Sequence, residues 1–502
     1  MSASALPSED RSPSRTEKVL PLPQGELHYT ATAAWQSLAK RNTPVADIFY
    51  VSYVAHGGEA DRPLTFVFNG GPGAASAYLH MGALGPKRIV FADGGRLPRP
   101  PVTVDHNLES WLPFTDLVFV DPIGTGFSRG KEQQQDAPKS PGDSPETSSS
   151  KSKGEEQPET PFWQVERDLK ALGEFMQRFL SSQNRWRSPI FIAGESYGGF
   201  RVARLTRLLQ QTFNISLSGA ILISPVLEFS LLAGSDYGVM PWVTLLPSLA
   251  AAAAYHGRSQ WEGAEGDYGA QLSAAEQFAY RELLPLLALG NATDAGERRA
   301  VFERLAALTG LPYDLVEGQG GRLSASFLRR ELLRQQQQIL GLYDASITAV
   351  DPFPDRPIYE GSDPTLDGII HLFAGATNSY LREDLGTQTE LIYELLNLEI
   401  FKAWQFELDG EAKQGYLGAV DDLRIGMTLN PHLRVYITHG WFDLVTPYGA
   451  SNFLAAQLRL PPQIAANLTL QHFAGGHMFY TWDSSRQQWR DAMVHFYQKA
   501  TR

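Results

Sequence analysis

Hydrophobic residues are spaced as in β-strands in the first half of the chain and again near its end. In residues 26–34 and again in residues 48–54, aromatic and β-branched residues alternate with polar ones, which predicts an antiparallel pair of strands. Short strand-like apolar runs follow at residues 64–68, 117–120, 189–193, 220–223, 434–438 and 468–472. The runs at 64–68 and 117–120 both end in glycine turns. This pattern predicts a mostly parallel sheet whose ligand crevice lies beyond the carboxyl ends of its strands.

The spacing becomes helical between the two groups of strands. From about residue 229 to about residue 429, apolar positions recur at helical intervals, for example in AAEQFAYRELLPLLALG and TELIYELLNLEIFKAW. We interpret this region as a helical cap that is inserted into the sheet and covers its crevice. Other helices are predicted after Thr160-Pro161, after Thr446-Pro447 and from about Ser485.

Composition divides the chain further. Residues 1–22 are rich in serine, proline and charge and are predicted to be disordered. Within the first part of the core, residues 130–160 contain no aromatic residue and no aliphatic residue larger than Ala137, which predicts a flexible, solvated loop. The predicted layout is a first core part at 23–228, a mostly helical cap at 229–430 and a second core part at 431–502.

Charge and cysteine content exclude several kinds of partner. The 502 residues carry a net charge of −12, which argues against nucleic acid or an anionic membrane as the main partner. A soluble small-molecule or peptide substrate fits this charge better. The absence of cysteine excludes disulfides, thiolate zinc sites and a cysteine nucleophile.

Targeting signals are not recognisable in the sequence. The N-terminus has no apolar core of signal-peptide length, and the apolar stretch at 245–255 is too short to span a bilayer. We therefore expect no membrane insertion and a cytoplasmic location for the sequence as written, or a periplasmic or secreted one if the N-terminus is incomplete or processed. The oligomeric state stays open.

The stretch PIFIAGESYGGFR at residues 189–201 carries the strongest candidate for chemistry. A short apolar strand leads into Gly-Glu-Ser-Tyr-Gly, and a segment with helical spacing follows. Glycines two before and two after Ser196 allow a tight strand-to-helix turn that exposes the serine hydroxyl. Ser196 is therefore the predicted nucleophile.

A serine nucleophile needs a base, and the base needs an acid to orient it, both in loops after later strands. His477 follows the strand at 468–472 in the turn AGGHMFY, and Asp443 follows the strand at 434–438 in HGWFDLVTP. The order Ser, Asp, His is the order expected of an α/β-hydrolase. Alternatives stay open at this point: His439 and His472 for the base, and Asp421 and Asp422 for the acid.

An oxyanion formed at Ser196 needs two hydrogen-bond donors. The amide of Tyr197 is one candidate, because it lies at a helix start where an unpaired N–H can receive negative charge. A backbone N–H within Asn69-Gly70-Gly71 is the other, because glycines allow the backbone to approach a substrate closely.

Five motifs in this order, FNGGPGAAS, DPIGTGFS, GESYGG, GWFDLVTP and AGGHMFY, resemble the serine carboxypeptidase family of α/β-hydrolases, in a bacterial-type form. The resemblance covers residues 60–228 and 434–480, whereas the cap is similar only loosely. It implies an α/β fold with a central, mostly parallel sheet flanked by helices and a large inserted helical cap. The site residues that it implies are Ser196 as nucleophile, His477 as base, Asp443 as its partner, the amides of Gly71 and Tyr197 as oxyanion hole, and Asn69 and Glu195 as ligands of a peptide's free carboxylate.

Some positions depart from the pattern of family members common in eukaryotes. Val67 replaces a tryptophan, Ala74 replaces a cysteine, and Ala83 replaces a glutamate that pairs with the glutamate of GESYGG. We expect a lone Glu195 to ionise more readily and to repel a substrate carboxylate. The resulting hypothesis is a weaker preference for acid pH than such enzymes show, and a pH–rate profile that peaks well below neutrality would contradict it.

The sequence thus predicts a serine-type carboxypeptidase that needs no metal or cofactor. Its substrate would be a peptide with a free C-terminus, whose last peptide bond is hydrolysed through an acyl-enzyme intermediate. The alternative is an esterase or acyltransferase with the same triad, which the missing carboxylate partners favour. A catalytically inactive binding module would need a broken triad, and the sequence shows none.

Overall fold

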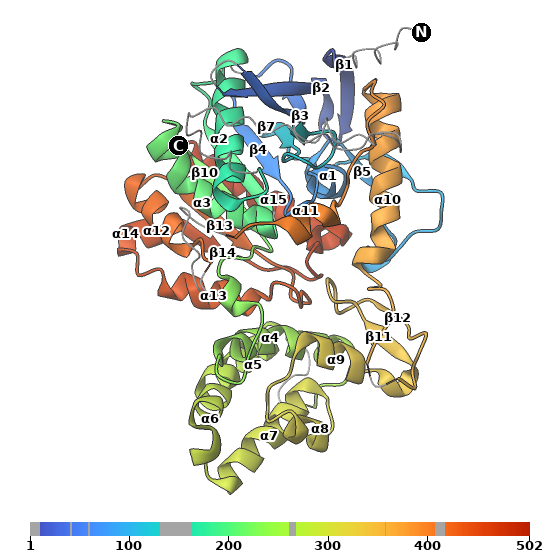
Figure 1. Cartoon of the computed structure of the whole chain (residues 1–502), viewed down its shortest axis with the longest axis vertical. Coiled ribbons are helices and arrows are strands. Elements are labelled where there is room, and N and C mark those ends of the chain that lie inside the picture. Colours follow the sequence, from blue (N-terminus) through green and yellow to red (C-terminus); the bar gives the residue numbers. More distant parts are fainter. Residues whose placement is uncertain are drawn as a thin grey trace, which may run out of the picture.

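A ten-stranded, mostly parallel sheet forms the centre of the computed structural model, which describes residues 11–40, 43–58, 61–130, 162–260, 268–356, 358–406 and 417–502 (Figure 1). The strand order is β1-β2-β3-β7-β4-β9-β10-β13-β14, and β8 pairs with β3. Strands β1, β2 and β3 pair antiparallel, whereas the neighbouring strands in the order β7-β4-β9-β10-β13-β14 pair parallel. In chain order the strands are β1 Ser14–Leu22, β2 Gly25–Lys40, β3 Thr43–Ala55, β4 Leu64–Phe68, β7 Asp116–Val120, β8 Arg129–Gly130, β9 Ile190–Glu195, β10 Gly219–Ile223, β13 Arg434–Thr438 and β14 Leu468–Leu470.

The antiparallel edge of the sheet begins earlier than the composition suggested. The predicted pairing of residues 26–34 with 48–54 is confirmed within β2 and β3. The prediction of disorder is wrong for Ser14–Leu22, because this segment pairs with β2 along its whole length as β1. Its polar composition reflects the half-exposed face of an edge strand, while Leu20 is buried. Residues 1–10 lie outside the described part.

Helices cover both faces of the sheet. Because successive side chains of a strand point to opposite faces, Phe66 and Phe68 pack on one side and Val67 on the other. The first side carries α2 (Val165–Ser182), α3 (Tyr197–Thr212), α12 (Val420–Leu429), α13 (Tyr448–Gln457) and α14 (Pro462–Ala465), and the second carries α1 (Ala77–Leu79), α10 (Leu366–Ser379) and α15 (Asp483–Ala500). The predicted fold class is confirmed by this three-layer arrangement.

Helix α2 begins later than its sequence signal. Thr160-Pro161 lies outside the described residues, and the first helical residue is Val165. The preceding backbone is extended because it pairs with Gln405, whose N–H donates to the carbonyl of Trp163 and whose carbonyl accepts from Val165. The predicted helix start is therefore wrong, since a distant segment fixes the backbone there. The predicted loop at 130–160 lies outside the described residues apart from Gly130, which is in β8.

A helical body lies apart from the sheet, at the bottom of Figure 1. It has a hydrophobic core of its own, to which Phe442 and Leu444 of the main body contribute. Its elements are α4 (Met240–Tyr255), α5 (Tyr268–Phe278), α6 (Leu284–Leu289), α7 (Ala295–Thr309), α8 (Tyr313–Gly318), α9 (Ala325–Glu331) and the hairpin β11 (Gln338–Leu340) and β12 (Thr348–Val350).

The helical body is smaller than the cap expected at 229–430. Helices α10 and α12 fall within that range, but Phe373 of α10 and Leu423 of α12 are buried against the sheet. A helical spacing of apolar residues shows that one face is buried, and it leaves open which surface buries it. The hairpin β5 (Lys87–Ile89) and β6 (Val104–His106) and the short helix α11 (Leu398–Ala403) complete the fold. No helix in the described part of the chain combines the length and the apolar character needed to cross a membrane.

Candidate active site

Ser196 lies in the turn between β9 and α3. Its backbone has φ 61° and ψ −122°, a region that L-residues rarely occupy. The turn is as tight as the sequence predicts. A Cβ atom on Gly194 would lie 2.2 Å from the carbonyl oxygen of Gly198, and one on Gly198 would lie 2.6 Å from that of Phe68. Glycine is therefore required at both positions for the serine to stand out of the turn.

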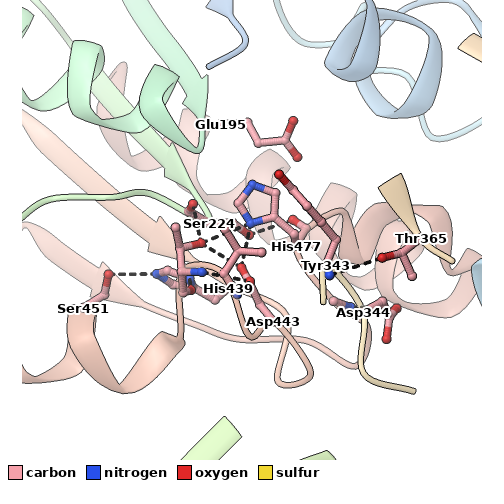
Figure 2. A network of polar contacts seen from close by, with 12 residues as sticks. Glu195, Ser224, Tyr343, Asp344, Thr365, His439, Asp443, Ser451 and His477 are labelled. Carbon is pink, nitrogen blue, oxygen red and sulfur yellow. Dashed lines mark hydrogen bonds and ion pairs between the residues drawn. The ribbon is translucent and has the colours of Figure 1, made fainter. Parts of the chain in front are cut away.

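His477 and Asp443 meet at the carboxyl ends of β14 and β13 (Figure 2). His477 Nδ1 lies 2.7 Å from Asp443 Oδ2. The other contacts of the carboxylate come from its own turn: the amides of Val445 and Thr446 donate to Oδ1 at 2.8 and 3.0 Å, and the Thr446 hydroxyl donates to Oδ2 at 2.8 Å. The buried aspartate is thus held in one orientation, and it fixes the tautomer of His477 with Nε2 unprotonated.

The alternative bases and acids have other partners. His439 Nδ1 lies 3.0 Å from the carbonyl of Thr446 and its Nε2 lies 2.8 Å from Ser451 Oγ, while His472 contacts Asn452. Asp422 forms ion pairs with Arg204 and Arg207, and the Asp421 side chain is 85% exposed. Of the candidates left open by the sequence, His477 is the histidine that lines a cavity together with Ser196, and Asp443 is the acid that contacts His477.

That cavity, of about 80 Å³, brings several of the predicted residues together, whereas Asp443 and Tyr197 do not line it. Ser196 and His477 line it together with three groups of the predicted substrate and oxyanion sites, namely Asn69, Gly71 and Glu195. Its other walls are Gly70, Ala74, Tyr78, Tyr343, Leu366, Leu396 and Met478. Because the cavity is small, a substrate group that enters it lies close to Ser196, His477 and Glu195.

The loop at Asn69–Gly71 lies directly against the serine turn. A Cβ on Gly70 would be 2.5 Å from the amide nitrogen of Tyr197, so only glycine permits this approach. The buried Arg201 of α3 fixes the loop, because it donates to the Asn69 carbonyl at 2.7 Å while pairing with Asp168 at 2.7 Å. In the part of the chain that the structure describes, no protein acceptor takes the N–H of Gly71 or Tyr197. Both amides are therefore available to an oxyanion.

Glu195 is buried and hydrogen-bonded through both carboxyl oxygens. The Asn69 side-chain amide donates to Oε2, and the Tyr480 hydroxyl donates to Oε1 at 2.7 Å. Burial raises the pKa of Glu195 to about 7, although the nearby His477 and the two hydrogen bonds act to lower it. Glu195 thus has a hydroxyl partner in Tyr480, although not the carboxyl partner whose absence Ala83 indicates, and burial outweighs the interactions that favour its ionised form.

The helical body supplies residues that the sequence did not point to. The N–H of His477 donates to the carbonyl of Tyr343, and the two rings pack edge to face at 5.3 Å (Figure 2). Asp344 accepts a hydrogen bond from Gly476 at 2.9 Å, and the amide of Ala345 donates to Phe442. These residues lie in the connection between β11 and β12. No motif marks them, because their role depends on contacts with loops that are distant in the sequence.

The electrostatics of His477 lead to a testable pH dependence. Burial by itself lowers its pKa, but the charge and hydrogen bond of Asp443 and the charge of Glu195 outweigh burial and raise the pKa above 6.5. A protonated Nε2 cannot accept the serine proton. We therefore expect the rate at which a fluorophosphonate labels Ser196 to fall as the pH falls through a value above 6.5. A labelling rate that stays constant to well below pH 6.5 would contradict this assignment.

The sheet order and the serine turn define the class of protein as an α/β-hydrolase. Its structure resembles the crystal structure of Kex1Δp, a prohormone-processing carboxypeptidase from Saccharomyces cerevisiae, with a TM-score of 0.54. The match covers 93% of this chain and 91% of that one at 13% identity, and it is a likeness of fold. Residues 37–232, which include Ser196, match the family model described as serine carboxypeptidase.

Two curated relatives agree with that family. Serine carboxypeptidase-like 5 from Arabidopsis thaliana is 26% identical over 226 residues, which are 43% of this chain and 44% of that protein. Pheromone-processing carboxypeptidase KEX1 from Yarrowia lipolytica is 32% identical over 165 residues, which are 32% of this chain and 21% of that protein. The chain thus matches less than half the length of these relatives.

Proposed function

We propose that this protein is a serine carboxypeptidase that removes the C-terminal residue of peptides. The observation that carries the proposal is the cavity in which Ser196 and His477 face Asn69 and Glu195, with Asp443 behind the histidine. A nucleophile, a base and a site for a terminal carboxylate lie within one small space. The match of residues 37–232, which include Ser196, to the serine carboxypeptidase family model supports the same reading.

The residues fit acyl transfer in two steps. Ser196 Oγ attacks the carbonyl carbon of the last peptide bond while His477 Nε2 takes its proton, and the imidazolium that forms is stabilised by Asp443. The amides of Gly71 and Tyr197 hold the oxyanion. His477 then gives the proton to the leaving amine, which departs as the free C-terminal amino acid. Water, deprotonated by the same nitrogen, attacks the acyl-enzyme and restores Ser196.

Asn69 and Glu195 distinguish a carboxypeptidase from other serine hydrolases in this proposal. A protonated Glu195 can donate a hydrogen bond to the carboxylate of the leaving residue, and its pKa of about 7 keeps it protonated in weakly acid solution. The carboxylate then lies beside the scissile bond. A substrate that lacks this group leaves buried polar atoms unpaired, which costs binding energy.

A comparison of one peptide with a free and an amidated C-terminus tests the proposal. We expect kcat/KM at weakly acid pH to be about 10- to 100-fold higher for the free acid, because it makes charge-assisted hydrogen bonds that the amide cannot make. Equal rates would refute the carboxypeptidase assignment and favour the esterase or acyltransferase that Val67 and Ala83 suggested. A short acyl ester serves as the control, because its hydrolysis needs the triad and no terminal carboxylate.

A further inference from the structure

Tyr480 contacts the carboxyl group that the proposed function uses. It lies in the turn after His477, is fully buried, and donates from its hydroxyl to Glu195 Oε1 at 2.7 Å. Its ring stacks on Trp489 at 6.1 Å and packs against Phe479. Tyr480 is therefore fixed by packing, and its hydroxyl fixes the Glu195 oxygen that Asn69 does not contact.

The chain makes room for this tyrosine at Gly82. A Cβ on Gly82 would lie 2.9 Å from Tyr480 Cε2 and 3.2 Å from Phe373 Cζ. Gly82 is thus a position at which any side chain would meet the Tyr480 ring. The absence of a side chain there lets the ring lie where its hydroxyl reaches Glu195.

Tyr78 is a second tyrosine near Glu195. It lines the cavity beside Glu195 and Ser196, and it is only 5% exposed. Among the residues that the structure describes, nothing pairs with its hydroxyl. Its ring packs on Phe373 at 4.8 Å, which holds the hydroxyl in place. A buried hydroxyl without a partner is unfavourable unless a ligand supplies one.

We infer that Tyr78 and Tyr480 complete the receptor for the substrate's terminal carboxylate. In this arrangement Tyr78 donates a hydrogen bond directly to the carboxylate and is a substrate-binding residue. Tyr480 holds Glu195 in the orientation needed to donate to the same carboxylate and is a positioning residue. The inference rests on the proposed function and names the groups that recognise its substrate.

The charges around Glu195 determine how this receptor responds to pH. The ionisable groups near its carboxyl are His477, Asp443, Tyr480 and Tyr78, with Tyr343 nearby. Burial raises the pKa of both Tyr78 and Tyr480, so neither loses its proton near neutrality. Glu195 is then the group of the receptor that ionises, with a pKa of about 7. An ionised Glu195 repels the carboxylate, so KM for a free-acid peptide is expected to rise as the pH rises through about 7.

Two tyrosine-to-phenylalanine variants give different signatures. Tyr78→Phe removes a donor to the substrate, so KM for the free acid should rise about 10-fold at weakly acid pH, with little change for the amidated peptide. Tyr480→Phe removes a hydrogen bond that favours ionised Glu195. The pH at which KM rises should therefore move upward by about one unit. Tyr436→Phe is the matched control. Tyr436 lies in β13, outside the cavity, and its hydroxyl donates to Gln471, so its loss should change neither quantity.

The same measurements, with Glu195→Gln added, separate the inference from the function on which it rests. Glutamine does not ionise, so this variant should lose the rise of KM with pH, and it tests the receptor even if Tyr480→Phe folds poorly. A wild type that treats free and amidated peptides alike overturns both the function and the inference. A wild type that discriminates, with KM and its pH dependence unchanged in Tyr78→Phe and Tyr480→Phe, overturns the inference alone.

Discussion

Replacing Ser196 by alanine is expected to reduce hydrolysis of a free-acid peptide by about 10⁴-fold or more, because the acyl-enzyme can no longer form. The fold should persist, because the turn between β9 and α3 depends on Gly194 and Gly198 and the side chain of Ser196 is partly exposed. The measurement is kcat/KM, together with stoichiometric labelling by a fluorophosphonate. Labelling should be lost in the variant.

A serine outside the cavity provides the control for this experiment. Ser110 donates to the carbonyl of Leu84 at 2.9 Å and does not line the cavity. Ser110→Ala should therefore keep both labelling and activity. Retention of label by Ser196→Ala would show that the reactive serine lies elsewhere in the chain.

Replacing Asp443 by asparagine is expected to lower kcat by about 10⁴-fold. The aspartate accepts from the two amides of Val445 and Thr446 on Oδ1, and from Thr446 Oγ1 and His477 Nδ1 on Oδ2. Asparagine can satisfy the amides with its oxygen, but its NH₂ group then faces the histidine. Nδ1 must become the acceptor, so Nε2 carries the proton and can no longer act as a base.

The pH dependence separates this tautomer effect from simple misfolding. In Asp443→Asn the imidazolium loses the negative charge that stabilises it, so the pKa of His477 should fall and the acid limb of the labelling profile should move to lower pH. Asp421→Asn, at an exposed position, is the control and should behave as wild type. A variant at 443 with nearly full activity would show that another acid orients the base.

Local sequence patterns predicted the structure correctly where one short segment contains all the residues that determine it. The stretch around Ser196 holds a buried strand, two required glycines and a helix, and the structure shows each of them. The central parallel strands could also be predicted from the sequence, because a strand buried on both faces is apolar throughout. The errors lie where distant segments intervene. Strand β1 has the composition of a disordered tail but pairs with β2, and α2 starts only where its pairing with Gln405 ends.

The cap shows the same difference on a larger scale. The helical prediction is confirmed for α5 and α6 but is wrong for most of TELIYELLNLEIFKAW, which is helical only at Leu398–Ala403 because Glu394 and Leu396 pair with loops of the core. Phe373 and Leu423 pack on the sheet and not in the helical body. The segment that matters most for the site, Tyr343 to Ala345, is the connection of a short hairpin in that body, and it contacts both the Asp443 and the His477 turns. Spacing along a helix reports a buried face, whereas the partner of that face is a property of the whole fold.

The sequence by itself determined the parallel strands of the sheet and the serine turn, because these depend on short-range steric rules, and its resemblance to a known family identified the candidate triad. The tertiary structure alone decided how Glu195 behaves. Its pKa of about 7 and its contact with Tyr480, 285 residues further along the chain, follow from burial and from a ring that fits only beside Gly82. Desolvation and long-range packing depend on where the whole chain lies in space, and no local pattern encodes them.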